Sequence, residues 1–158
     1  MFECNNIYSI WDKRLIRGVK NYRRLAKQVE YKGTRDVKRN SHVFSFEDDT
    51  TDVLKPLGVK NMYPGILEAD DVISWMCKYT SGKKMVVSVD QDMLQLVDEN
   101  TSVYSPIKDV VIDYNNFESI TGVPREHFLR YKSLVGDKSD NLPGVERCGK
   151  KTAQKLIK

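Results

Sequence analysis

The segment 67–71 holds three carboxylates within four positions, Glu68, Asp70 and Asp71, and acids this dense can bind a metal ion. The apolar residues that follow recur at helical spacing, which predicts a helix over about 68–80 with the acids in its first turn. A helix N-terminus favours one or two acids because its backbone offers free N–H groups. Glu68 and Asp71 would share a helix face and repel each other unless a cation lies between them. An ion network is the alternative for this cluster taken alone.

Acids elsewhere in the chain follow the ends of predicted elements. Strands are predicted over 6–11 and 85–89, the second as a buried run, and a helix is predicted from 124 to about 135. The acids that follow these three elements are Asp12, Asp90, Asp92, Asp137 and Asp140. Ligands of open α/β sheets bind beyond the strand ends, and carboxylates without paired His or Cys select Mg²⁺ or Mn²⁺ over zinc. Two such ions about 3.5–4 Å apart would support phosphodiester cleavage.

The remaining pattern alternates helices and strands. A basic helix with an apolar stripe is predicted over 15–29, and Gly33 is a plausible end for it. Residues 36–63 are irregular, with one short helix near 51–57, and two short strands are predicted over 102–105 and 110–112. The alternation predicts an α/β fold with a central parallel sheet flanked by helices.

Composition limits the class of protein. The chain has 158 residues, 40% of them hydrophobic, and a formal charge of +4, which fits one ordinary globular domain. It has neither a run of membrane-spanning length nor a signal-peptide pattern, so no membrane partner is expected. Three cysteines without a CxxC pair predict reduced thiols and a cytoplasmic setting.

Positive charge gathers near both ends of the chain. Eleven Lys and Arg lie between Lys13 and Arg39 against two acids, and the last twelve residues hold five more and no acid. Basic ends around acidic centres suit a polyanion held near a cation site, although solvated helix faces are the alternative. Residues 142–153 place a glycine-bounded turn before a basic helix, and such a turn can present N–H groups to a phosphate. A helix C-cap at Gly149 is the alternative there.

Four motifs together resemble those of the 5′-3′ exonuclease/flap endonuclease family of phages and bacteria. They are Leu-Glu-Ala-Asp-Asp (67–71), Ser-Val-Asp-Gln-Asp (88–92), Val-Gly-Asp-Lys-Ser-Asp-Asn (135–141), and Pro-Gly-Val (143–145) with Gly-Lys-Lys-Thr-Ala (149–153). The resemblance spans roughly 7–158. It implies a PIN-like 5′ nuclease fold that ends in a helix–three-turn–helix DNA-binding motif. The implied domains are 1–135, a resolvase-like nuclease domain lacking its first strand, and 136–158, the start of the DNA-binding region.

The resemblance also implies roles for individual residues. Two Mg²⁺ or Mn²⁺ ions would be held by Asp12, Glu68, Asp70, Asp71, Asp90, Asp92, Asp137 and Asp140. Lys32 and Arg35, in a Tyr-Lys-x-x-Arg motif, would contact the scissile phosphate of DNA. Duplex DNA would be bound by Gly144, Val145, Gly149, Lys150, Lys151 and Thr152. The family often holds a K⁺ ion at this motif as well.

The sequence departs from the family pattern in several places. The family's first strand, which carries an essential Asp, has no counterpart here, and the chain ends inside the second helix of the DNA-gripping motif. Arg147-Cys148 stands where Gly-Ile is usual, and Asp12 lies further from Lys32 than is usual. We therefore expect a fragment, a split-gene product or a degenerate copy. Such a chain would be weakly active alone and would be completed by a second polypeptide that supplies an N-terminal strand.

Three functions fit these residues. The leading one is a metal-dependent 5′ nuclease acting on 5′ ends, flaps and nicked or branched DNA. The second is a non-catalytic DNA-binding remnant of the same fold, which the missing acid favours. The third is a small PIN-type ribonuclease, which would keep fewer acids and would not need the turn over 144–153.

Overall fold

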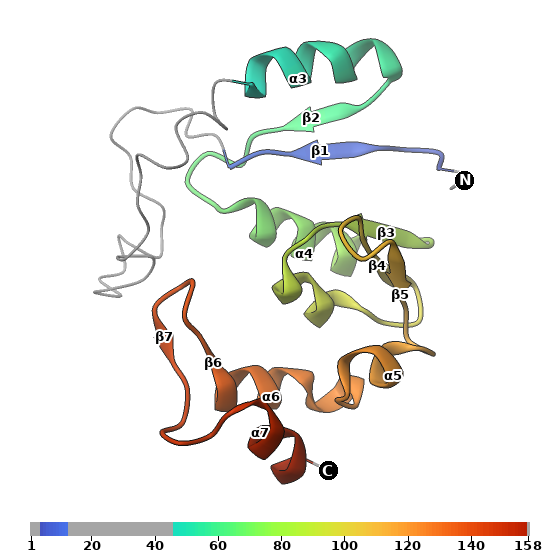
Figure 1. The fold of residues 1–158 in the computed structure, drawn as a ribbon. Coiled ribbons are helices and arrows are strands. Elements are labelled where there is room, and N and C mark those ends of the chain that lie inside the picture. The colour runs from blue at the N-terminus through green and yellow to red at the C-terminus, as the bar shows by residue number, and fades with distance from the viewer. Residues whose placement is uncertain (1–3, 13–45, 158) are drawn as a thin grey trace. The chain divides into compact units, whose positions relative to one another are not determined.

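The computed structural model describes residues 4–12 and 46–157, and the chain divides into two units (Figure 1). The N-terminal unit extends to Val72, and the C-terminal unit begins at Ile73. Each unit is described by itself below. The predicted basic helix over 15–29 and its end at Gly33 lie outside the described residues.

A pair of parallel strands forms the centre of the N-terminal unit. The described elements are β1 (Tyr8–Ile10), α3 (Glu47–Leu54), a 3₁₀ helix (Lys55–Leu57), β2 (Lys60–Met62) and the first residues of α4 (Ala69–Tyr79). In the parallel pair, Tyr8 lies opposite Lys60 and Ile10 opposite Met62. The Trp11 ring nitrogen donates to Asn61 Oδ1 at 3.1 Å, which extends the pairing beyond the strand end. The predicted strand over 6–11 is thus confirmed.

The short helix of the polar connector begins earlier than its pattern predicts. The sequence predicts it near 51–57, whereas α3 begins at Glu47 and the 3₁₀ turn continues it to Leu57. Three acids fill the first turn, where the positive end of the helix dipole favours them: Glu47, Asp48 and Asp49. Gly58, with φ of 78°, ends the 3₁₀ turn in the left-handed conformation that favours glycine.

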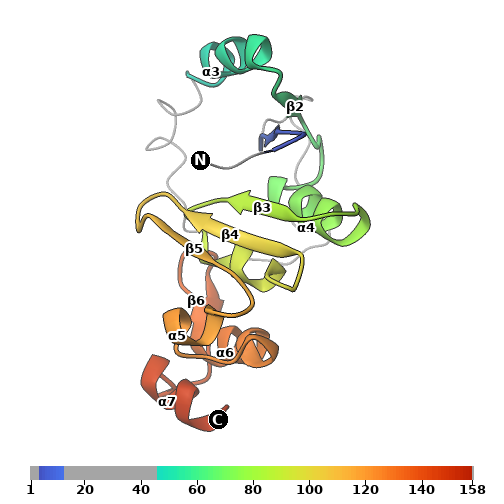
Figure 2. The same cartoon turned by 90° about the vertical axis from the view of Figure 1, so that its right-hand side faces the viewer.

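The C-terminal unit combines a three-stranded sheet with short helices (Figure 2). Its further elements are β3 (Lys84–Val87), a 3₁₀ helix (Gln91–Leu96), β4 (Thr101–Ser105), β5 (Val110–Ile112), α5 (Phe117–Thr121), a 3₁₀ turn (Arg125–His127), α6 (Phe128–Val135), β6 (Gly136–Asp137), β7 (Leu142–Pro143) and α7 (Lys150–Leu156). The predicted helix over 68–80 and the predicted strands over 102–105 and 110–112 are confirmed as α4, β4 and β5.

The sheet of the C-terminal unit is only partly parallel. Strand β3 pairs with β4 in parallel, whereas β5 pairs with β4 in the antiparallel sense. The connections explain this difference, because a short link can only reverse the chain, and a parallel pair needs a crossover of about a dozen residues. Residues 106–109 form the short link, and residues 88–100, which include a 3₁₀ helix, form the crossover.

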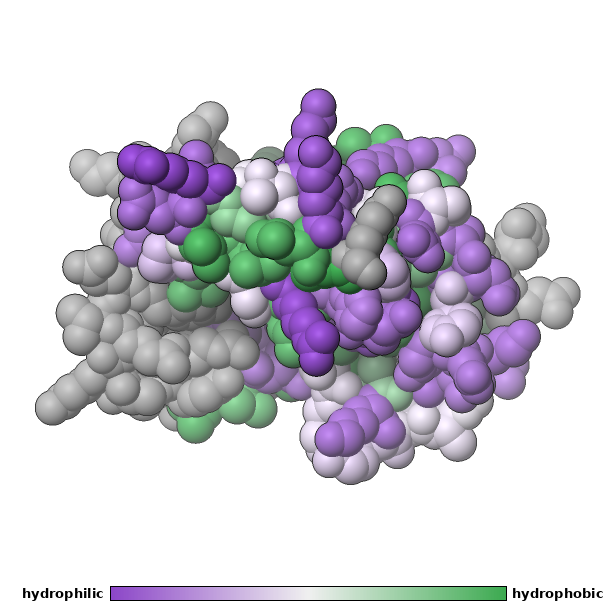
Figure 3. All heavy atoms as spheres, turned by 90° about the horizontal axis from the view of Figure 1, so that it is seen from below, coloured by the Kyte–Doolittle hydropathy of each residue, from purple (hydrophilic) through white to green (hydrophobic). Residues whose placement is uncertain are grey.

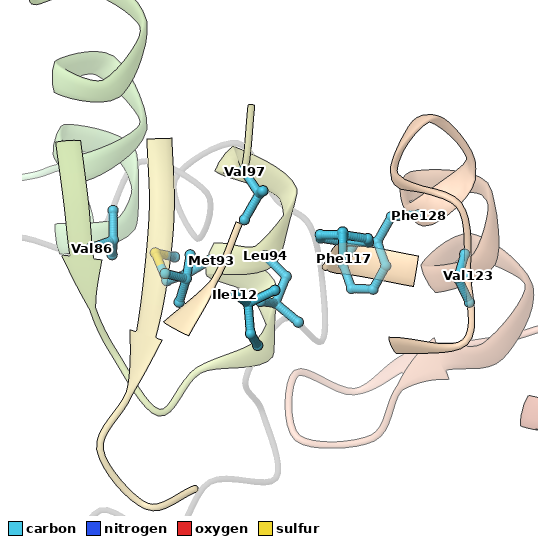
Figure 4. Packing of buried hydrophobic residues seen from close by; sticks show 9 residues of the cluster. Val86, Met93, Leu94, Val97, Ile112, Phe117, Val123 and Phe128 are labelled. Atoms are coloured by element: carbon cyan, nitrogen blue, oxygen red, sulfur yellow. The ribbon is translucent and has the colours of Figure 1, made fainter. Parts of the chain in front are cut away.

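The core of the C-terminal unit lies between the sheet and the short helices (Figure 4). Phe117 and Phe128 meet edge to face, with ring centroids 5.3 Å apart. Ile73 and Cys77 of α4 pack against the same cluster. The prediction that residues 85–89 form a wholly buried strand is wrong. Val86 is buried but Val87 is 63% exposed, because successive strand side chains point to opposite faces and only one face is covered here.

Two further expectations concern the cysteines and the membrane. Cys4, Cys77 and Cys148 are all free thiols. Within the described part of the chain, every helix is too short or too polar to cross a membrane.

Arg125 holds the crossover segment to the helical part of the C-terminal unit. Its guanidinium donates to the backbone carbonyls of Val97 and Gln95 and lies 5.9 Å from the centroid of the Phe117 ring. We expect Arg125→Met to lower the free energy of unfolding by about 2–4 kcal/mol, because both carbonyls lose a charged donor. Urea denaturation would measure this loss. Arg130→Met, at an exposed position, is the control, and equal midpoints for the two variants would contradict the assigned role.

Candidate metal and nucleic-acid site

The acids of the N-terminal unit meet at the first turn of α4. Asp12 follows β1, and its Oδ1 accepts a hydrogen bond from the Ala69 backbone N–H at 2.6 Å. Asp71 Oδ2 accepts one from the backbone N–H of Glu68 at 3.0 Å. These two N–H groups belong to the helix start, where the first backbone donors have no partner within the helix. Asp12 and Asp71 therefore cap α4 from two directions.

These carboxylates can bind a cation while they cap the helix. A carboxylate has two oxygens and about four lone-pair sites, so one oxygen can accept from the backbone while the group still binds a cation. Glu68, directly before the helix, is 7% exposed, which places a third carboxyl in a partly dehydrated position. Asp70 lies in the same first turn. The structure thus gathers all four predicted acids of this unit around one helix end.

In the C-terminal unit, a lysine joins two of the predicted acids. Lys132 Nζ of α6 lies 2.8 Å from Asp92 Oδ1 and 2.9 Å from Asp137 Oδ2. Asp92 comes from the 3₁₀ helix after β3, and Asp137 comes from β6 directly after α6. The Lys132 side chain is only 19% exposed, so the three charges interact in a partly buried setting. Two carboxylates from separate elements are therefore placed to share one cation.

The protonation of this group is set by its hydrogen bonds. Burial alone would lower the pKa of Lys132, but the hydrogen bonds from its ammonium to Asp92 and Asp137 raise that pKa above its ordinary value. Hydrogen bonds from Ser139, and then from Lys132, hold the pKa of Asp137 well below its usual range. Asp137 is consequently ionised, and Lys132 charged, throughout the neutral range.

Asp90 and Asp140 complete the acids of the C-terminal unit. Asp90 Oδ1 accepts from the Asp92 backbone N–H at 2.8 Å and so begins the 3₁₀ helix. The backbone N–H groups of Ser139 and Asp140 point at Asp137 Oδ1, at 2.8 and 3.4 Å. These short-range bonds order both acidic turns.

The donor chemistry fits a hard divalent cation. Every predicted ligand is a carboxylate, and the Asp92–Lys132–Asp137 contact shows that positive charge is held between two of them. Within residues 4–12 and 46–157, no set of three or more His, Cys, Asp or Glu side chains is close enough to hold a metal by itself. The two acid groups lie in separate units.

Lys132 is the site residue that reasoning from the sequence missed. The available signal was its position, because Lys132 lies four residues after the buried Phe128 and therefore on the same face of α6. A lysine on the core side of a helix needs a charge partner. Lys32 and Arg35, the predicted phosphate contacts, lie outside the described residues.

The predicted DNA-binding turn is fixed to the end of α6 by a close approach of two backbones. We call residues 144–149 the terminal turn. The Val145 backbone N–H donates to Leu134 O at 2.8 Å. A Cβ on Gly144 would lie 2.4 Å from the carbonyl of Val135, and one on Gly136 would lie 2.3 Å from the Gly144 nitrogen. Only glycine fits at either position. The backbone at the end of α6 and the backbone of the terminal turn are therefore in direct contact.

The terminal turn is exposed except for the half-buried Cys148, and it leads into the basic helix α7. Gly149 precedes α7 in an extended conformation, so the alternative that it ends a helix is wrong. Arg147 has a φ of 59°, a left-handed conformation that costs a non-glycine residue about 1–2 kcal/mol. This strain gives a physical reason why glycine suits the position better.

Comparisons with known proteins agree with this architecture. The family described as 5′-3′ exonuclease, N-terminal resolvase-like domain, matches residues 3–122, and the one described as 5′-3′ exonuclease, C-terminal SAM fold, matches 123–158. A flap endonuclease of bacteriophage T5, solved with DNA and metal ions, has the same fold, with a TM-score of 0.78 at 22% identity. That similarity covers 97% of this chain and 59% of the phage protein. The predicted α/β fold is confirmed, with α6, the terminal turn and α7 as its helix–turn–helix.

Relatives with higher identity are bacterial 5′-3′ exonucleases. The protein of Buchnera aphidicola from Acyrthosiphon pisum is 38% identical over 110 residues, which are 67% of this chain and 38% of that protein. The Aquifex aeolicus protein is likewise 38% identical over 110 residues, 68% of this chain and 38% of that protein. The chain therefore matches well under half the length of these two relatives. On the strength of the matched domains and these identities, the chain belongs to the 5′-3′ exonuclease family.

Proposed function

We propose that this chain carries the nuclease core of a metal-dependent 5′-3′ exonuclease or flap endonuclease. Its substrates would be 5′ ends, flaps and nicked or branched duplex DNA. One observation carries the proposal: Asp92 and Asp137, from separate elements, share a cation within hydrogen-bonding distance. Within the N-terminal unit, the acids at the start of α4 are proposed as metal ligands as well.

The roles proposed for the acids follow from their chemistry. Two Mg²⁺ or Mn²⁺ ions would be held by the eight carboxylates named above, which match the oxygen ligands that these ions prefer. When bound, such ions activate water and neutralise charge on a phosphodiester. Lys132 holds Asp92 and Asp137 beside one ammonium group. Together with Ser139, it keeps the pKa of Asp137 well below its usual range. Lys32 and Arg35 are proposed to contact the scissile phosphate.

Contact with duplex DNA is proposed for the terminal turn and the start of α7. Gly144, Val145, Gly149, Lys150, Lys151 and Thr152 are all exposed and could meet a sugar–phosphate backbone. Carbonyl groups of the same turn would hold the K⁺ ion. We further propose that the nuclease part extends to about Val135 and the DNA-binding part begins at Gly136. The expected second polypeptide gains no support from the relatives and stays a prediction.

The proposal is tested on a synthetic duplex with a labelled 5′ flap. The purified chain should release short 5′ products slowly with Mg²⁺ or Mn²⁺ and none in chelator. Binding to the flap without cleavage under any metal would favour the non-catalytic DNA-binding remnant. Cleavage of single-stranded RNA in preference to the flap would favour the PIN-type ribonuclease.

A further inference from the structure

The Lys132 ammonium lies between the two carboxylates that are proposed to bind a metal at the end of α6. Its Nζ is 2.8 Å from Asp92 Oδ1 and 2.9 Å from Asp137 Oδ2. Asp92 Oδ1 is buried, and within the described part of the chain the ammonium is its only polar partner. The positive charge beside this oxygen therefore comes from the protein itself.

A divalent ion on Asp92 and Asp137 would need the same carboxylate oxygens. Mg²⁺ binds its oxygen ligands at about 2.0–2.1 Å, closer than the ammonium does. An ion on either oxygen would lie at most about 5 Å from Nζ, since both cations contact the same atom. Like charges at this distance repel strongly in a partly buried setting. Lys132 therefore opposes the ion, unless its ammonium moves away.

The Lys132 side chain can move away while the acidic turns stay in place. Lysine carries its charge on a flexible four-carbon stem, and this side chain is not fully enclosed. Asp137 is held by its own turn, because the Ser139 backbone N–H donates to Oδ1 at 2.8 Å. Asp92 is held by its backbone N–H, which donates to Asp90 Oδ1 at 2.8 Å. The turns that carry the two carboxylates therefore do not depend on Lys132.

We propose that Lys132 is a built-in competitor of the divalent metal at Asp92 and Asp137. It neutralises the two carboxylates when no metal is bound and withdraws from them when an ion binds. This role rests on the proposed function, because it takes Asp92 and Asp137 as metal ligands. The consequence is a metal affinity below the one that the two carboxylates would have without the lysine.

The test measures Mn²⁺ binding to the purified chain by isothermal titration calorimetry, without DNA. Lys132→Met removes the ammonium but keeps a side chain of similar length, and it should raise the Mn²⁺ affinity at least about tenfold. Lys132→Arg keeps the charge and should bind Mn²⁺ no more tightly than the wild-type chain. Adding Asp92→Asn to Lys132→Met should abolish the gain, which would locate it at this pair of carboxylates.

Thermal melting gives a second readout, which a merely structural lysine would not move. In chelator, Lys132→Met should melt below the wild-type chain, because two carboxylates lose their partner. In Mn²⁺ this difference should shrink, because an ion that binds the variant more tightly also stabilises it more. A lysine with a structural role alone would leave the difference unchanged by Mn²⁺.

The matched control for net charge is Lys138→Met. Lys138 is exposed, lies next to Asp137 in the sequence, and forms no ion pair with a described residue. Hydrophilic side chains cover much of the face shown in Figure 3, so a general change in surface charge has to be separated from a change at one site. Lys138→Met should change the Mn²⁺ affinity less than about twofold, because solvent screens an exposed charge.

The outcomes separate the competitor from the metal site itself. Equal gains from Lys132→Met and Lys138→Met would show that only net charge matters and would overturn the proposal. If Asp92→Asn alone weakens Mn²⁺ binding while Lys132→Met leaves it unchanged, the competitor fails and the metal ligands stand. If Asp92→Asn leaves Mn²⁺ binding unchanged with either residue at position 132, the ligand assignment fails and the competitor fails with it.

Discussion

Asp71→Asn is expected to lower Mg²⁺-dependent cleavage of a 5′ flap at least about a hundredfold while leaving the melting temperature unchanged. Asparagine keeps an oxygen that can accept the Glu68 backbone N–H, so the cap of α4 survives the change. The negative charge that a divalent ion needs is lost. Bound ions contribute several kcal/mol to the transition state, and about 1.4 kcal/mol corresponds to a tenfold change in rate.

Two further variants separate the capping role of Asp71 from its proposed metal role. Asp71→Ala should lower both cleavage and stability, because the cap is lost with the charge. Asp52→Asn removes an equal charge from an exposed ion pair with Lys55 in the same unit and should leave both unchanged. Full cleavage by Asp71→Asn would mean that this carboxylate only caps the helix. Initial rates on the labelled flap and thermal melts would provide both readouts.

Gly144→Ala should destabilise the protein by about 3 kcal/mol, whereas Gly149→Ala, five residues later, should cost less than about 1 kcal/mol. At Gly144 the new methyl would lie 2.4 Å from the Val135 carbonyl, and backbone atoms cannot turn away as a side chain can. At Gly149 nothing lies within 4 Å, and φ of −79° suits any residue. Nothing in the sequence distinguishes the two glycines. The difference between the two variants therefore measures the contribution of the backbone contact at Gly144.

Urea denaturation of both glycine variants would measure these costs, with the slope checked for a change in cooperativity. DNA binding should also fall for Gly144→Ala, because the terminal turn is held through this contact. A Gly144→Ala variant as stable as Gly149→Ala would show that α6 and the terminal turn can move apart without cost.

Elements with dense local patterns could be predicted from the sequence. Helix α4 and strand β5 agree with prediction because apolar spacing and turn residues define them locally. Strand β2 has no such pattern, and the partner that orders it, β1, lies far away in the sequence. The start of α3 is not predicted, because its acids, which favour a helix start, equally suit a polar connector.

The acids of the candidate site could be predicted from the sequence, whereas its lysine could not. Asp12, Asp71 and Asp137 lie where predicted, just after a strand, in the first turn of a helix and just after a helix. Lys132 belongs to no motif. Its role depends on its ion pairs with Asp92 and Asp137, which form only in the folded chain.

The pairing of β1 with β2 has a consequence for how the chain acquires its structure. It joins Tyr8 to Lys60, so a long loop must close before any of its contacts can form. In the C-terminal unit, by contrast, β4 meets β5 across a short turn that pairs Ser105 with Val110. Contacts between distant residues slow folding, whereas local contacts speed it. The C-terminal unit should therefore order first, and the chain should hold Asp92 and Asp137 in place before Asp12 reaches α4.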